Sequence, residues 1–207
     1  MKKSYFSIAL LALTLTASTA FSQAFEKGGK YINVNLGAAQ MWHIGGDLNY
    51  NNYGFNGYTP ITGQLGLQME FGVHEYVGVG FTTGLGFGAG LGGHRYYGYY
   101  GYYNYNYYTP EVNIPIGAFA NFHFYQLIAD KTGKDIHADK LDIYAGLNVG
   151  SGAAILLPKN SDKTYVSALF FIGPHVGVRY FFNEKVGVNA ELGYGKSFFN
   201  GGVVFKL

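Results

Sequence analysis

Residues 77–90 read VGVGFTTGLGFGAG, and this stretch indicates the fold class. Large apolar residues at Val77, Val79, Phe81, Leu85 and Phe87 alternate with glycine or threonine. A period of two sends successive side chains to opposite faces of a strand. Glycine at nearly every second position excludes a helix, because each one costs about 1 kcal/mol relative to alanine. The stretch therefore predicts a β-strand with one bulky apolar face and one face of small residues.

The same alternation recurs along the chain and predicts a closed barrel. Candidate strands cover residues 30–41, 61–73, 77–90, 112–125, 141–155, 165–182, 186–195 and 200–207. Their lengths bracket the roughly 9 to 11 residues with which a tilted strand crosses a bilayer. In a soluble β-sandwich or a lipocalin-like barrel the bulky face would point inward, whereas a narrow barrel has room inside only for small or polar groups. We expect an all-β protein, a closed antiparallel eight-stranded transmembrane β-barrel with aromatic-rich outer loops.

The composition excludes several classes of protein. Only 13% of the residues are charged and 32 of 207 are glycine, against roughly 25% and 7% in soluble domains. These values argue against an ordinary water-soluble enzyme core. The chain has no cysteine, which removes disulfides, zinc-thiolate sites and thiol catalysis.

The N-terminal residues are expected to be a secretory signal. Lys2 and Lys3 precede an apolar stretch at residues 8–17, and small residues then end two motifs at Ala20 and Ala24. A membrane anchor would need about 20 apolar residues. We therefore expect residues 1–24 to be a signal peptide and residues 25–207 the barrel, with cleavage after Ala20 as the other choice. Without the two lysines, 12 basic residues balance 12 acidic ones, so nucleic acid is not expected as a partner.

The connections predict which end of the barrel faces outward. If the chain enters from the periplasm, outer loops fall at residues 42–60, 92–109, 156–164 and 196–199, and tight inner turns at 73–76 and 183–185. Long outer and short inner connections are typical of these barrels. Residues 126–140 form a longer inner connection, which we interpret as a solvated turn.

Two outer loops are rich in Tyr, Asn and Gly, and they form the candidate binding surface. Tyrosine offers a broad contact area at low entropic cost, and Asn and Gly add adaptable hydrogen bonds. The alternative is that the rings stack across a hairpin or rest at the headgroup level. The candidate residues are Tyr50, Tyr53, Tyr58, Tyr96, Tyr97, Tyr99, Tyr100, Tyr102, Tyr103, Tyr105, Tyr107 and Tyr108.

The parity of the strands also predicts charges inside the barrel. His175, Arg179, Glu191 and Glu70 form an expected lumen charge cluster, and a short turn should bring Glu191 within a rung or two of His175 and Arg179. Further residues with inward parity are Glu111, His123 and Lys206. A buried charge needs a partner, so we expect a salt-bridged plug, with a gated proton or ion path as the alternative.

Three stretches carry a family resemblance. Residues 171–182 (FIGPHVGVRYFF) and 186–195 (VGVNAELGYG) resemble the small outer-membrane β-barrel proteins of Gram-negative bacteria, including opacity-like and OmpX-like eight-stranded barrels. The end of the chain, N-x-G-x-x-F-x-L over residues 200–207, resembles the signal read by the barrel-assembly machinery, although Leu207 stands where an aromatic residue is usual. The resemblance covers residues 25–207 and implies an outer-membrane location, with membrane lipid and the assembly machinery as partners. It transfers no active site.

The expected function is a structural or surface-recognition, adhesion-like role for a monomer, with a glycan or protein ligand at the outer loops. The alternative is a narrow pore for small solutes or ions. A lipid-modifying enzyme is a weaker alternative, because no His-x-Ser motif occurs, although Ser151, Ser167 or Ser197 could meet His123 or His175 in space. No cofactor or metal is expected, since the histidines are at least 14 positions apart.

Overall fold

The structure is a computed structural model that describes residues 23–38, 43–44, 62–98, 101–134, 136–157, 164–194 and 196–207. At residues 43–44, 62, 89–98, 101–109, 156, 165 and 167 the backbone alone is described. No helix in these ranges has the length and apolar character needed to cross a membrane.

The described strands close into a barrel, which confirms the predicted fold class. Neighbouring strands pair antiparallel in the order β7-β6-β5-β4-β3-β1-β9-β8, and β8 pairs with β7 to close the ring. A two-residue strand, β2 (His43–Ile44), adds to β7 at Leu169 and Phe170. The eight barrel strands are β1 (Lys30–Ala38), β3 (Thr62–His74), β4 (Val77–Gly98), β5 (Gly101–Phe122), β6 (Leu141–Leu156), β7 (Tyr165–Phe181), β8 (Val186–Gly193) and β9 (Phe199–Lys206).

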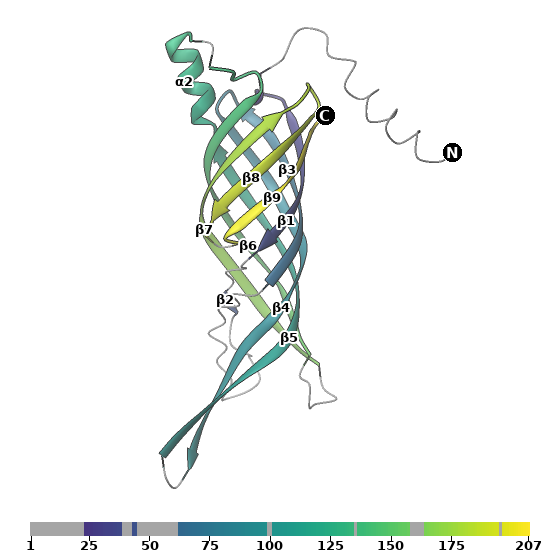
Figure 1. Ribbon diagram of the computed structural model, residues 1–207, viewed down its shortest axis with the longest axis vertical. Helices are drawn as coiled ribbons and strands as arrows, with labels where there is room; N and C mark the ends of the chain where they lie inside the picture. The colour runs from purple at the N-terminus through teal and green to yellow at the C-terminus, as the bar shows by residue number, and fades with distance from the viewer. Residues whose placement is uncertain are drawn as a thin grey trace, which may run out of the picture.

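The β4–β5 hairpin is much longer than the sequence pattern predicts. Residues 92–109 were expected to form a loop, but pairing runs from Val77 opposite Phe122 out to Gly98 opposite Gly101. The expectation of a loop was wrong because tyrosine favours strands, so the antiparallel ladder continues beyond the last large aliphatic residues. The hairpin projects far past the other strands, at the end of the barrel opposite α2 and the C-terminus (Figure 1).

The inner connection after β5 contains a helix rather than only a turn. Helix α2 (Phe124–Thr132) occupies much of residues 126–140 and ends at Gly133, whose φ of 61° is the left-handed conformation that commonly terminates helices. The predicted strand 112–125 also ends earlier, at Phe122, because the helix takes its last residues.

The two faces of the barrel wall have opposite polarity. On β1, Asn33 and Asn35 are buried, whereas Val34 is 42% exposed and Leu36 is 69% exposed. The pattern repeats on the other strands, where Phe81 and Ile172 are each 65% exposed. A soluble protein would reverse this arrangement. The apolar outer face and the polar inner face are those of a barrel surrounded by lipid.

Candidate functional site

Four ionisable side chains form the arginine cluster, which we define as Arg179, Glu70, His123 and Asp142. Arg179 Nη2 forms an ion pair with Glu70 Oε2, and Arg179 Nη1 lies 3.7 Å from Asp142 Oδ2. None of the four is more than 2% exposed. Buried charges of this kind are stable only as mutual partners, so the cluster ties β3, β6 and β7 together across the lumen.

His123 bridges the two carboxylates of the arginine cluster. Its Nδ1 lies 2.9 Å from Asp142 Oδ1 and its Nε2 lies 3.1 Å from Glu70 Oε1. Both ring nitrogens can donate only in the imidazolium form. The cluster then holds two cations and two anions, and its net charge is zero. In the described part of the chain, no group of three or more acidic or histidine side chains could hold a metal ion.

Glycines on the inner face make the room that these groups occupy. A Cβ at Gly78 would overlap the Glu70 carboxylate, and one at Gly177 would overlap the ring of Tyr144. The Tyr144 ring in turn lies 4.5 Å from Arg179 Cζ, a cation–π contact. The inward glycines therefore accommodate large side chains from neighbouring strands.

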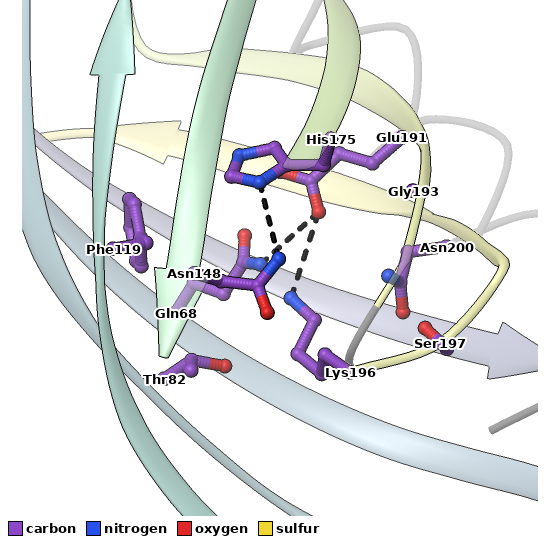
Figure 2. A pocket seen from close by; sticks show the side chains of 10 residues that line it. All are labelled: Gln68, Thr82, Phe119, Asn148, His175, Glu191, Gly193, Lys196, Ser197 and Asn200. Atoms are coloured by element: carbon purple, nitrogen blue, oxygen red, sulfur yellow. Dashed lines mark hydrogen bonds and ion pairs between the residues drawn. The ribbon is translucent and has the colours of Figure 1, made fainter. Parts of the chain in front are cut away.

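A second polar group, the lysine cluster, lies further toward the hairpin end and consists of Lys196, Glu191, Gln68 and Tyr144. Lys196 Nζ lies 3.6 Å from Glu191 Oε2, which also accepts a hydrogen bond from Gln68 Nε2 at 3.1 Å (Figure 2). Tyr144 Oη donates to Glu191 Oε1 at 2.8 Å. Tyr144 therefore connects the lysine cluster to Arg179.

His175 is held by neutral partners. Its Nε2 lies 2.7 Å from Asn121 Oδ1. Its Nδ1 lies 3.3 Å from Asn148 Nδ2, a contact that Figure 2 shows. A neutral imidazole with its proton on Nε2 satisfies both contacts, since it donates to Asn121 and accepts from Asn148.

A small cavity separates His175 from Lys196 and Ser197. Its volume of about 10 Å³ is near the lower limit for one water molecule. Buried polar atoms with no hydrogen-bond partner line it, namely Thr82 Oγ1, Asn148 Oδ1 and Ser197 Oγ. Water is the occupant that fits such a space.

Apolar side chains occupy the lumen beyond the cavity. Leu169 and Phe171 of β7 are buried together with Ala154 of β6. A Cβ at Gly150 or Gly117 would overlap or crowd the Phe171 ring, so these glycines let the ring lie across the barrel. Polar and apolar layers thus follow one another along the barrel axis.

The structure changes the expected pairing of Arg179. The turn between β7 and β8 brings Glu191 opposite Gly177 in the ladder and Asn189 opposite Arg179. Arg179 pairs with Glu70 and Asp142, whereas Glu191 pairs with Lys196. Glu191 thus lies two positions along the ladder from Arg179, as predicted, but the predicted ion pair between them was wrong.

Sequence reasoning missed two charged members of these clusters. Asp142 has the same inward parity as Tyr144 on β6, so the alternation could have identified it. Lys196 lies in the expected outer loop 196–199, yet it is only 7% exposed. No strand parity applies to a loop residue, and only the fold brings Lys196 into the lumen. Glu111, as its parity predicts, is buried.

The structure describes the backbone of only some of the candidate tyrosines. Tyr50, Tyr53, Tyr58, Tyr99 and Tyr100 lie outside the described residues. The others belong to β4 or β5, where the register places Tyr96 opposite Tyr103 and Tyr97 opposite Tyr102. Tyr105, Tyr107 and Tyr108 lie opposite His94, Gly92 and Leu91. Their side chains are outside the description, so stacking across the hairpin stays a prediction.

The geometry gives no support to a serine nucleophile. Both ring nitrogens of His123 contact carboxylates and both of His175 contact asparagine amides. No hydrogen bond between a histidine and Ser151 or Ser197 is found among the described side chains, and the Ser167 side chain is outside the description. A serine hydrolase requires such a contact.

Comparison with known proteins identifies the fold. No protein-family model and no curated protein matches the sequence. Among solved structures, the outer membrane protein OprG from Pseudomonas aeruginosa aligns with a TM-score of 0.53 and 12% identity, covering 90% of this chain and 99% of OprG. The N-terminal β-barrel domain of P. aeruginosa OprF (TM-score 0.44, 13% identity) covers 88% of this chain and 100% of that domain. The attachment invasion locus protein Ail of Yersinia pestis (TM-score 0.40, 11% identity) covers 88% of this chain and 96% of Ail.

The fold is that of Gram-negative outer-membrane β-barrels, and the apolar outer face is consistent with location in such a membrane. The short turns, α2 and the C-terminus lie at one end of the barrel, and the long hairpin lies at the other (Figure 1). Barrels of this class have short turns in the periplasm and long extensions outside the cell. By this rule the β4–β5 hairpin is expected on the extracellular side.

Proposed function

We propose that the protein is a surface-recognition barrel, in which a filled membrane anchor presents the β4–β5 hairpin to a glycan or protein outside the cell. The observation that carries this proposal is the length of the hairpin. Each of its strands has 22 residues, about twice the number that crosses a bilayer.

The apolar outer face locates the part of the hairpin that leaves the membrane. Among the described side chains, the large apolar residues exposed on β4 run as far as Phe87, and those on β5 begin at Ile114. On this basis we propose that residues 88–98 extend beyond the lipid-facing wall. At about 3.4 Å per residue this extension is of order 35 Å, enough to reach past a layer of headgroups.

The composition of the extension fits recognition by adaptable contacts rather than by charge. Arg95 is the only Lys, Arg, Asp or Glu residue in 89–109. Tyr, Asn and Gly make up most of the remainder, the combination that binding loops favour. A partner held by stacking and hydrogen bonds, such as a glycan, is the expected ligand class.

The filled lumen supports an anchor over a pore. The arginine and lysine clusters cross the lumen with ion pairs, and the cavity near His175 has room for about one water. An eight-stranded barrel is just wide enough for its own side chains. A narrow pore is therefore the weaker candidate.

A register-matched deletion tests the proposal. His94 lies opposite Tyr105 and Gly93 opposite Asn106, so residues 94–105 can be replaced by Asn-Gly, which favours a tight hairpin turn. We expect loss of whole-cell attachment to glycan-coated and protein-coated surfaces, with heat-dependent gel migration retained.

Two control measurements complete the test. A variant with Tyr96, Tyr97, Tyr102 and Tyr103 changed to Phe keeps the rings and removes the hydroxyls, so attachment through hydrogen bonds should fall. If the deletion lowers the melting temperature but leaves attachment unchanged, the hairpin only rigidifies the barrel. Stepwise single-channel conductance of the intact protein in planar bilayers would favour the pore.

A further inference from the structure

Residues 23–29 fold across the periplasmic end of the barrel and attach to several elements there. Ala24 N donates to Ala138 O at 2.9 Å, and Lys206 Nζ donates to Gln23 O at 2.8 Å. Gly28 N donates to Gly72 O at 2.7 Å. These bonds join the segment to the α2–β6 connection, to β9 and to β3.

Phe25 is the centre of this segment. Its ring is fully buried and stacks on His123 with the ring centroids 3.4 Å apart and the planes at 7°. It also stacks on Tyr31 at 5.5 Å. A buried cluster surrounds it, made of Ala24, Tyr31, Phe181 and Val204. Phe25 therefore covers the arginine cluster on its periplasmic side.

Glu26 holds the segment in place beside Phe25. Its carboxylate Oε1 lies 3.0 Å from Lys206 Nζ, and its backbone N–H donates to Tyr31 Oη at 2.9 Å. Lys206 thus contacts both Gln23 and Glu26, one residue on each side of the Ala24–Phe25 pair.

We infer that Gln23 and Ala24 remain on the mature chain, as part of a periplasmic plug formed by residues 23–29. Two small-residue motifs, ending at Ala24 and at Ala20, satisfy the rule for signal cleavage, the second nearly as well as the first. Cleavage after Ala24 would remove the bonds to Ala138 and from Lys206 to Gln23, together with the Ala24 side chain, which is only 2% exposed. Phe25 would then be a chain terminus, and termini that lack attachments fray. Cleavage after Ala20 keeps every one of these contacts.

The assignment changes the expected boundary between signal and barrel. The mature chain begins at Phe21, upstream of the predicted start at residue 25. The plug closes the lumen on the periplasmic side and is independent of any recognition by the hairpin.

The mass of the natural protein tests the processing site. Mature protein purified from outer membranes is analysed by intact mass and by sequencing its N-terminal peptide. We expect Phe21 as the first residue, and any start from Phe21 to Gln23 leaves the plug complete. A mature chain that starts at Ala24 or later overturns the inference, and one that keeps Met1 overturns cleavage after Ala20.

A pair of refolded chains tests the plug itself. One begins at Phe21 and the other at Phe25, and each is refolded from inclusion bodies into detergent. We expect the shorter chain to melt several degrees lower. The change Phe25→Ala should lower the melting temperature by about 10 °C, whereas the control Phe182→Ala should shift it by less than about 2 °C, because Phe182 is 57% exposed on the outer face at the same end. Equal melting of the two chains, or equal effects of the two substitutions, refutes the plug.

Discussion

Replacement of Arg179 by Met is the most direct test of the arginine cluster. The side chain of Met has a similar length and no charge, so Arg179→Met leaves Glu70 and Asp142 facing one imidazolium instead of two cations. Arg179 and Glu70 have no exposed surface. Removal of one partner from a buried ion pair costs about 3–5 kcal/mol, because the other charge stays buried without compensation.

The double variant measures the interaction between Arg179 and Glu70 separately from the interactions that each makes with other residues. Arg179→Met combined with Glu70→Gln leaves His123 paired with Asp142, so the net charge of the cluster returns to zero. We expect Glu70→Gln alone to cost a similar amount to Arg179→Met. The double variant should be more stable than the sum of the single effects predicts, by about 2 kcal/mol.

The assay is reversible unfolding by urea in lipid vesicles, with the folded fraction measured by the gel mobility of unheated samples. Glu70 and Lys196 are the matched control pair, because they carry opposite charges in the same lumen and belong to different ion pairs. Their effects should add within about 0.5 kcal/mol. Additive effects for Arg179 and Glu70 would refute the direct pairing.

Three further outcomes follow from the same geometry. Gly177→Ala should destabilise the barrel by about 1–3 kcal/mol, because the new methyl group overlaps the Tyr144 ring. The control Gly63→Ala should change stability little, because the space around Gly63 is open. Equal urea midpoints for the two variants would contradict this prediction. His123 follows β5 and lies outside the membrane-spanning strands. Burial lowers the pKa of His123, but the carboxylates of the arginine cluster raise it by more, so that the pKa lies above its ordinary value. The stabilisation is complete below about pH 6.5, the ordinary value, and is lost as pH rises through the folded-state pKa. Melting temperatures should therefore fall as pH rises above about 6.5, and His123→Gln should flatten that dependence. Deletion of residues 94–105 should leave the melting temperature of the barrel within a few degrees, because no lipid-facing wall is removed, as calorimetry can show.

Strand existence and strand faces follow from the sequence of this protein alone. The alternation in residues 77–90 assigns each side chain to one face before any partner strand is known, because the period of a strand is two. One face carries large side chains and the other carries small ones, so the face with large side chains cannot point into a narrow eight-stranded barrel. Val79 and Phe81 are exposed and Thr82 is buried, as this reasoning requires.

Strand ends are less predictable because they depend on partners. The tyrosines after residue 91 form strands since β4 and β5 pair with one another, and a Tyr-Gly composition suits a loop equally well. Phe124 starts α2 rather than extending β5, although its apolar character continues the strand pattern.

The choice of ion-pair partners is decided only by the tertiary structure. Parity correctly predicts that Arg179, Glu70 and Glu191 are all buried, but parity carries no information on how strands are staggered around a closed barrel. Glu70 is 109 positions from Arg179 in sequence. Lys196 enters the lumen from a loop, where strand alternation does not assign side chains to an inner or outer face. Coulomb energy falls with distance, so the stagger of the strands determines which opposite charges meet, and that stagger exists only once the barrel has closed.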